Sequence, residues 1–244
     1  MLSPAVEDYL KAIFTLQTES GEDGPVGTSR LAEHMNVSSA SVTNMLKRLD
    51  TLSLATYTAY KGVRLSEAGR TIALEIIRHH RLLETYLRDV MGYDWEEMHA
   101  EAERLEHHIS EEFEDRLDHM LGYPTHDPHG DPIPDRDGAM VEIASEPLSS
   151  CPFDTPLVVR RVTDTDVEVL RAIELLNLLP GQEVTILGNS HHAHPSEGTM
   201  ETGGEYPGES GAVITVRHGP RILSVPEDLA QHVFASPRAD HPAT

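Results

Sequence analysis

The chain has 244 residues and a formal net charge of -22, and its length is sufficient for two or three small domains. Its single cysteine, Cys151, excludes an internal disulfide and a cysteine-rich metal site, which fits a reducing cytoplasm. The sequence shows no signal peptide and no apolar run approaching the roughly 18 residues that a membrane-spanning helix needs. We therefore expect a cytoplasmic protein with no membrane partner.

The negative charge is unevenly distributed along the chain. Residues 1–75 carry seven basic and nine acidic side chains, so nearly all of the net negative charge lies in the rest of the chain. The N-terminal part is thus the only region suited to contact a nucleic-acid backbone. A low lysine content with abundant Asp and Glu resembles the proteins of salt-adapted archaea.

The first predicted helix covers residues 3–19. Ser3 is a candidate N-cap, Pro4 occupies the first helical position, and apolar residues from Val6 to Leu16 recur at helical spacing. A capped start followed by an apolar stripe is typical of an amphipathic helix that packs on a core.

The next segment, TSRLAEHMNVSSASVTNMLKRLDTLSLA, predicts two short helices joined by a tight turn. The first helix has Thr28 or Ser29 as its cap, and the second begins at Ser38 and Ser39. A second helix that starts with small hydroxyl residues is typical of a helix-turn-helix whose recognition helix approaches base edges.

A two-stranded wing is predicted next, because apolar and polar residues alternate on either side of Lys61-Gly62. Basic side chains on the recognition helix and the wing can reach DNA phosphates. The residues that we expect to contact DNA are Arg30, Ser38, Ser39, Ser41, Thr43, Asn44, Lys47, Arg48, Lys61 and Arg64. The alternative interpretation is a winged-helix domain that binds another protein.

Three further helices are predicted between Ser66 and Gly122, with Ser66, Asp94 and Ser110 as caps and Gly92 as the end of the first helix. These helices carry more apolar residues than one layer of packing needs. The surplus residues are Leu74, Ile77, Leu87, Val90 and Met91. The surplus indicates a dimerisation domain, and a homodimer suits a palindromic DNA operator.

Histidine and carboxylate side chains gather at helical spacing within residues 79–108. The sets that share a helix face are His80 with Glu84, and His99 with Glu103, Glu106 and His107. Imidazole and carboxylate ligands suit Mn, Fe or Zn. In so acidic a chain, a solvated surface is the alternative, but apolar stripes on the same helices favour packed helices that fix these groups in space.

The remainder of the chain predicts a loop followed by a β-rich domain. Residues 123–146 are rich in Pro, Gly, His and Asp without periodicity, so we expect a linker or ordered loop. The histidines in and beside it are expected to be solvated; these are His119, His126 and His129. Residues 150–234 predict a small β-barrel, and its polar insert, with His191, His192 and His194, predicts a solvated loop.

The chain resembles the diphtheria toxin repressor family of metal-dependent transcriptional regulators across nearly its whole length. The motifs that carry the resemblance are PAVEDYLKAIFTL, SSASVTNMLKRL, HHRLLETYL, HAEAERLEHHIS, GDPIP, LLPGQEVTI and SVPEDLAQHVF, in that order. The resemblance implies a mainly α fold with β. Its parts would be a winged helix-turn-helix DNA-binding domain (1–66), a helical metal-binding and dimerisation domain (67–123), a linker (124–149) and an SH3-like, FeoA-type β-barrel (150–236).

The resemblance also implies two metal sites. The primary site would consist of Asp8, Glu103, Glu106 and His107. The ancillary site would consist of His80, Glu84, His99 and a carboxylate of the SH3-like domain, for which Asp166 is the first choice and Asp164 and Glu168 are competitors.

Three positions bear on the identity of the metal. The iron-responsive branch of the family has methionine and cysteine where this chain has Asp8 and Glu103, and the harder oxygen ligands favour Mn(II) over Fe(II). Lys11 stands where manganese regulators with paired ions have a glutamate, which argues against a binuclear site here.

The resemblance therefore implies a repressor of metal-uptake genes, with Mn(II) or Fe(II) as corepressor, acting as a homodimer on double-stranded DNA. Two alternatives remain from the residues alone. One is a metal-independent winged-helix regulator that responds to a small molecule. The other is a di-iron carboxylate enzyme, which is disfavoured because only Glu103-Glu106-His107 matches the Glu-x-x-His motif that such enzymes use twice.

Overall fold

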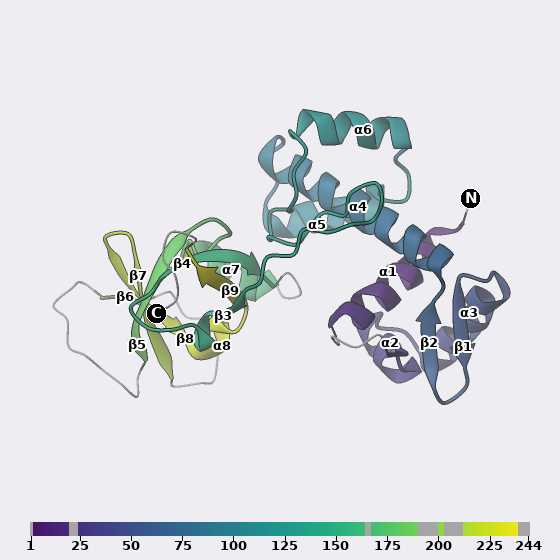
Figure 1. Ribbon diagram of the computed structural model, residues 1–244, viewed down its shortest axis with the longest axis horizontal. Helices are drawn as coiled ribbons and strands as arrows, with labels where there is room; N and C mark the ends of the chain where they lie inside the picture. The colour runs from purple at the N-terminus through teal and green to yellow at the C-terminus, as the bar shows by residue number, and fades with distance from the viewer. Residues whose placement is uncertain (1, 20–23, 164–166, 190–199, 203–211, 239–244) are drawn as a thin grey trace. The chain divides into compact units, whose positions relative to one another are not determined.

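The computed structural model describes residues 2–19, 24–163, 167–189, 200–202 and 212–238 (Figure 1). The chain forms two compact units. Unit 1 contains Met1–Tyr86, Ala100–Thr125 and Ile133–Met140, and unit 2 contains Leu87–His99, His126–Pro132 and Val141–Thr244. Among the described helices, none is long and apolar enough to cross a membrane.

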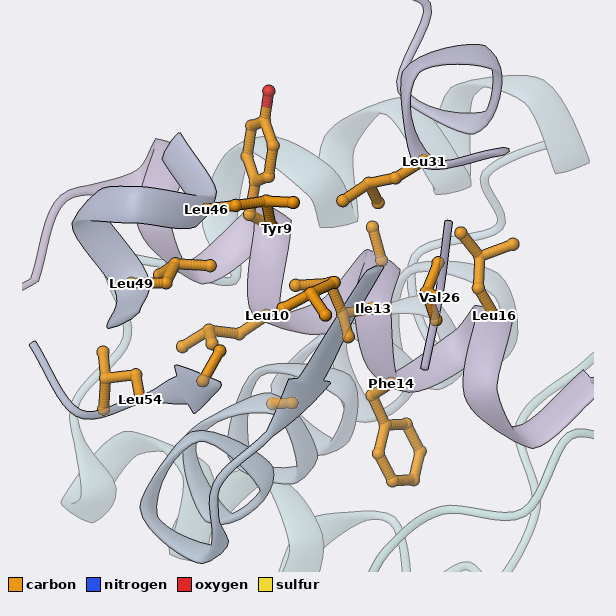
Figure 2. Packing of buried hydrophobic residues seen from close by; sticks show 14 of the residues in the cluster. Tyr9, Leu10, Ile13, Phe14, Leu16, Val26, Leu31, Leu46, Leu49 and Leu54 are labelled. Atoms are coloured by element: carbon orange, nitrogen blue, oxygen red, sulfur yellow. The ribbon is translucent and has the colours of Figure 1, made fainter. Parts of the chain in front are cut away.

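Unit 1 begins with a winged helix-turn-helix. Its elements are α1 (Pro4–Glu19), α2 (Thr28–His34), α3 (Ser39–Thr51) and the antiparallel hairpin of β1 (Ala55–Thr58) and β2 (Gly62–Leu65). Figure 2 shows Leu10 and Ile13 of α1 among Leu31 of α2 and Leu46 and Leu49 of α3, and all five side chains are fully buried. This apolar core fixes the orientation of α1, whose opposite face carries the charged residues described below.

The helix boundaries of this domain agree in part with the predicted caps. The Ser38 hydroxyl accepts a hydrogen bond from the Ser41 N–H (3.2 Å) and caps α3 as predicted. The prediction for α2 was wrong: Gly27 is its N-cap, and Thr28 already lies in the helix. A short polar side chain is therefore not needed at this start, because Gly27 supplies the required extended backbone.

Three helices follow the wing: α4 (Glu67–Asp89), α5 (Trp95–Leu105) and α6 (Glu111–Met120). Their predicted caps are confirmed, since Ser66, Asp94 and Ser110 accept hydrogen bonds from Gly69, Glu97 and Phe113 N–H groups. Of the apolar surplus, Leu74, Ile77 and Leu87 are buried within the single chain, whereas Val90 and Met91 are exposed.

A buried polar network holds α6 against α4. Arg78 donates hydrogen bonds to Glu114, to Asp118 (2.7 Å) and to the Pro134 carbonyl oxygen (2.7 Å), while His79 Nε2 lies 3.1 Å from Glu114. Burial opposes ionisation of Glu114, but hydrogen bonds and charge from His79 and Arg78 prevail and lower its pKa to about 2. Glu114 is therefore an anion that is fully paired inside unit 1.

Unit 2 contains the sheet of the C-terminal domain. Its elements are β3 (Glu146–Pro147), a 3-10 turn (Leu148–Ser150), β4 (Pro156–Val162), α7 (Val167–Leu175), β5 (Glu183–Asn189), β6 (Met200–Thr202), β7 (Val213–His218), β8 (Arg221–Pro226), α8 (Glu227–Ala230) and β9 (Val233–Pro237). The strand order is β3-β9-β4-β5-β7-β8-β6, and all neighbours are antiparallel except β6 and β8. The polar insert was predicted to be a loop, but its residues Met200–Thr202 form strand β6. His191, His192 and His194 of the same insert lie outside the described residues.

An aromatic stack within unit 2 corrects one prediction about the loop. His129 was expected to be solvated, but it is only 1% exposed and its ring lies 4.7 Å from the Trp95 ring. The Arg88 guanidinium lies over the Trp95 ring, 4.5 Å from the ring centroid. Its Nη2 atom also lies 2.8 Å from Oε1 of Glu174 on α7. The expectation failed because Trp95 offers an apolar surface that the local sequence around His129 does not reveal.

We predict that Glu114→Gln lowers the free energy of unfolding by roughly 2–4 kcal/mol at neutral pH, because it breaks a buried ion pair. The stabilisation by an acid with a lowered pKa is fully present above the unfolded value of 4.5 and is lost as pH falls from 4.5 toward 2. Urea unfolding followed by helical circular dichroism at pH 7, 4.5 and 3 should show the gap between variant and wild type narrowing in acid. Glu112→Gln, in an exposed ion pair on the same helix, is the matched control. Equal effects of the two variants at every pH would contradict the prediction.

Candidate metal centre

Three charged residues of α1 lie on one helix face. Glu7, Asp8 and Lys11 are spaced at i, i+1 and i+4, and all three are partly buried. This face of α1 meets the C-terminal end of α5. The winged helix-turn-helix thereby contributes two carboxylates and one ammonium to a polar cluster in unit 1.

Asp8 meets Glu106 and His107 in this cluster. One potential ligand atom from each of the three residues lies within 4.8 Å of the other two. His107 Nε2 is 2.9 Å from Asp8 Oδ1 and 3.5 Å from Glu106 Oε1. The predicted helix face extends slightly beyond the helix itself, because α5 ends at Leu105 and Glu106 and His107 lie in the following turn. The Glu106 N–H still bonds to the Ala102 carbonyl (2.9 Å), which keeps Glu106 in helical register.

Glu103 lies beside Lys11. The Lys11 Nζ is 2.6 Å from Glu103 Oε1 and 2.9 Å from both carboxylate oxygens of Glu106. Burial disfavours the charged ammonium, but the charges and hydrogen bonds of Glu106 and Glu103 outweigh it and raise the pKa of Lys11. The structure therefore places Lys11 as a fixed cation between two predicted metal ligands.

His80 connects the same cluster to Glu84 on α4. Its Nε2 is 3.0 Å from Glu84 Oε1, and its Nδ1 is 2.5 Å from Glu106 Oε2 and 3.8 Å from Glu103 Oε1. Burial disfavours the imidazolium and so does Lys11, but the Glu84 charge and the hydrogen bonds to Glu106 and Glu84 raise the pKa of His80 to about 10. His80 is therefore positively charged at neutral pH in this state.

The remaining predicted ancillary ligands are only partly described. His99 precedes Glu103 by one turn on α5. Glu168 lies in the first turn of α7 and is exposed, whereas Asp164 and Asp166 lie outside the described residues. The carboxylate that completes the ancillary site thus stays a prediction.

The surroundings of Asp8 are such that a bound cation would stabilise its ionised carboxylate. Burial raises the pKa of Asp8, as do Glu103 and Glu106, against the lowering influence of His107 and Lys11. A carboxyl group crowded by other carboxylates holds its proton more tightly, and added positive charge relieves that crowding. Carboxylate and imidazole groups without thiolate fit a hard or borderline divalent ion.

Glu7, Lys11 and His79 have contacts that sequence reasoning did not identify. His107 Nδ1 lies 2.7 Å from Glu7 Oε2, and His79 Nδ1 lies 3.0 Å from the Glu106 carbonyl oxygen. The i, i+4 spacing of Glu7 and Lys11 beside Asp8 was the available signal. It could indicate a shared helix face, but not which partner that face meets.

The predicted DNA-contacting residues lie on the surface of α2, α3 and the wing. Thr43 is half-buried, and its hydroxyl donates to the Ser39 carbonyl oxygen (2.8 Å). The others are exposed, and they are Arg30, Ser38, Ser39, Ser41, Asn44, Lys47, Arg48, Lys61 and Arg64. The face is therefore accessible, with Lys47 and Arg48 in the C-terminal half of α3 and Lys61 and Arg64 at the wing.

Comparison with known families identifies the chain. Residues 1–63 match the N-terminal DNA binding domain of iron dependent repressors, and residues 66–135 match their metal binding and dimerisation domain. The iron-dependent repressor IdeR of Mycobacterium tuberculosis is 33% identical over 201 residues, which cover 76% of this chain and 84% of that protein. The chain belongs to the iron-dependent repressor family. This finding confirms the resemblance to the diphtheria toxin repressor and its relatives.

Two further comparisons extend this result. The regulator MntR of Bacillus subtilis is 34% identical over 123 residues, which cover 50% of this chain and 84% of that protein. A manganese-dependent transcriptional repressor, solved in complex with manganese, has a TM-score of 0.75 at 28% identity and covers 96% of this chain and 100% of that one.

The comparisons settle the class of protein. They confirm the predicted fold class, with its winged helix-turn-helix, helical dimerisation domain and SH3-like C-terminal domain. They also confirm a DNA-binding, metal-dependent transcriptional repressor rather than an enzyme. Relatives in both the iron-dependent and the manganese-dependent groups leave the choice between the two metals to be tested.

We predict that Lys11→Gln destabilises the metal-free protein and increases its response to metal. The substitution leaves the buried Glu106 carboxylate without one of its cationic partners. The free energy of unfolding should fall by about 2–3 kcal/mol. This is less than the ~3–5 kcal/mol for a fully buried pair, because the Lys11 side chain is 21% exposed. Thermal unfolding in chelator should show a lower midpoint, and added Mn(II) should raise it further than in wild type. Lys47→Gln on exposed α3 makes the same change in net charge and serves as the control. Identical midpoints for both variants, with and without Mn(II), would refute this role of Lys11.

Metal uptake through His80 should release protons. Since the pKa of His80 is about 10, this side chain must lose a proton before it can ligate, so apparent affinity should rise with pH up to about 10. Calorimetric titration with Mn(II) in buffers of different ionisation enthalpy counts the protons released. His80→Gln should release fewer protons than the exposed control His34→Gln. The same proton count in both variants would exclude His80 as a ligand.

Proposed function

We propose that Mn(II), in preference to Fe(II), is the corepressor and binds a primary site formed by Asp8, Glu103, Glu106 and His107. The observation that carries the proposal is the meeting of Asp8 from α1 with Glu106 and His107 from the end of α5. Carboxylate oxygens dominate this set, and hard oxygen donors favour Mn(II) over softer ions. Cys151, the sole thiol in the sequence, belongs to unit 2 and is buried there.

Glu103 completes the primary site by exchanging its ion pair with Lys11 for the metal ion. The ancillary site takes His80, Glu84, His99 and Asp166, of which His80 and Glu84 are already in contact. Glu103, His80 and Glu84 thus already take part in ion pairs in the present state.

Repression follows from the position of Asp8 on the first helix of the winged helix-turn-helix. Without a divalent ion, Lys11 pairs with Glu103 and Glu106, but Asp8 remains crowded by these two carboxylates, which makes the contact of Asp8 with the end of α5 weaker than it is with metal. A shared ion removes this repulsion and supplies positive charge that both helices bind. Metal affinity and DNA affinity are then coupled, and a coupling of roughly 1–3 kcal/mol corresponds to about 5- to 150-fold tighter DNA binding.

A homodimer would present two α3 helices about one DNA helical turn apart to a palindromic operator. A repressor active when metal is plentiful suits genes for metal uptake, and such control takes place in the cytoplasm. The domain limits 1–66, 67–123, 124–149 and 150–236 are part of this proposal, with the second region providing the dimer contact.

The test is fluorescence anisotropy of labelled DNA taken from the region upstream of the gene that encodes this protein, measured at high KCl. DNA binding should be absent in chelator and appear with metal, and Mn(II) should reach half-saturation at a lower free concentration than Fe(II). Asp8→Asn should weaken metal-dependent DNA binding at least tenfold, since it removes a charged ligand on α1. Asp89→Asn, at an exposed position at the end of α4, should behave like wild type.

Equal DNA binding in chelator and in Mn(II) would make the Asp8, Glu106 and His107 cluster a structural feature without a corepressor role. A lower half-saturating concentration for Fe(II) than for Mn(II) would overturn the metal assignment alone.

A further inference from the structure

Both ring nitrogens of His107 are engaged by consecutive carboxylates of α1. His107 Nδ1 lies 2.7 Å from Glu7 Oε2, and His107 Nε2 lies 2.9 Å from Asp8 Oδ1. The His107 side chain is 7% exposed and the Glu7 side chain 14% exposed, so solvent competes little for this contact. The imidazole is therefore held at both edges by the DNA-binding domain.

The chemistry of the two contacts differs. An ionised carboxylate can only accept hydrogen bonds, so Glu7 is suited to accept a hydrogen bond from a protonated Nδ1. A metal ion binds Nε2 only through the lone pair of that nitrogen, so an imidazole that ligates through Nε2 carries its one ring proton on Nδ1. In this structure Nε2 is the nitrogen that faces Asp8 and Glu106, the other members of the cluster.

We propose that Glu7 is the positioning residue of the primary metal site. It binds no metal itself; it fixes the proton of His107 on Nδ1 and turns Nε2 toward Asp8 and Glu106. The inference rests on the proposed function insofar as the cluster must take a divalent ion. It adds a role for a residue outside the predicted ligand set, and it gives α1 a second connection to the ligands on the α5 side.

The geometry distinguishes Glu7 from a residue that acts only through its charge. The 2.7 Å separation is that of a strong, charge-assisted hydrogen bond, about twice as strong as a neutral one. A glutamine at this position keeps an oxygen that can accept from Nδ1 but loses the charge. An alanine loses both, so the two substitutions separate orientation from charge.

The experiment is calorimetric titration of the metal-free full-length protein with Mn(II). Glu7→Ala should lower the affinity of the primary site roughly 10- to 100-fold, the range typical for lost hydrogen-bond partners of metal-bound histidines. Glu7→Gln should fall between Glu7→Ala and wild type. The control Glu33→Gln makes the same change in net charge at an exposed position of α2 and should match wild type.

A second readout reports on the imidazole itself. In protein loaded with diamagnetic Zn(II), the ¹⁵N spectrum of the His107 ring should show a protonated Nδ1 and a ligating Nε2 in wild type and in Glu7→Gln. In Glu7→Ala this uniform pattern should be lost, with part of the protein ligating through Nδ1 or leaving the His107 ring unligated. A merely structural role of Glu7 would lower thermal stability and leave this tautomer pattern unchanged.

Asp8→Asn separates failure of this inference from failure of the proposed function. Weakened metal binding in Asp8→Asn with unchanged affinity and ring signals in Glu7→Ala would overturn the role of Glu7 and leave the metal site intact. Unchanged metal binding in both variants would overturn the site itself. Equal losses in Glu7→Gln and Glu7→Ala would show that charge, and not orientation of His107, explains the effect.

Discussion

The buried carboxylate of Glu106 is the constraint on which unit 1 depends. Its side chain is fully buried, and an unpaired charge in such a place costs several kcal/mol. Two cationic side chains neutralise this carboxylate: Nζ of Lys11 on α1 lies 2.9 Å from Glu106 Oε2, and Nδ1 of His80 on α4 lies 2.5 Å from it. Three helices that are distant in sequence are therefore held together by one anion.

This arrangement explains how a change of charge at one point reaches the DNA-binding domain. Lys11 projects from the same face of α1 as Asp8, and the opposite face of α1 contributes Leu10 and Ile13 to the core beneath α3. A close-packed core moves as a unit rather than deforming locally. If Lys11 or Asp8 changes its partner beside Glu106, the change therefore acts on α1, the helix that supports the recognition helix α3.

The sequence predicted features that depend on neighbours within one helix, and it failed where partners come from elsewhere. The caps at Ser38, Ser66 and Ser110 and the helical register of Glu103 and Glu106 are local and were predictable. The contact of Glu7 with His107 and the ion pairs of Lys11 depend on how α1 packs against α5, which periodicity cannot specify. For the same reason His129 was predicted to be solvated although it packs against Trp95.

Lys11 also bears on how so acidic a protein can select a metal. Carboxylates attract every divalent cation, so a dense acidic cluster alone discriminates poorly. The ammonium of Lys11 already neutralises part of the charge of Glu103 and Glu106, both within 2.9 Å. A competing ion gains little from net charge alone and must replace these contacts with ligand bonds. Selectivity then depends on the placement of Asp8 and His107, both of which are held by α1.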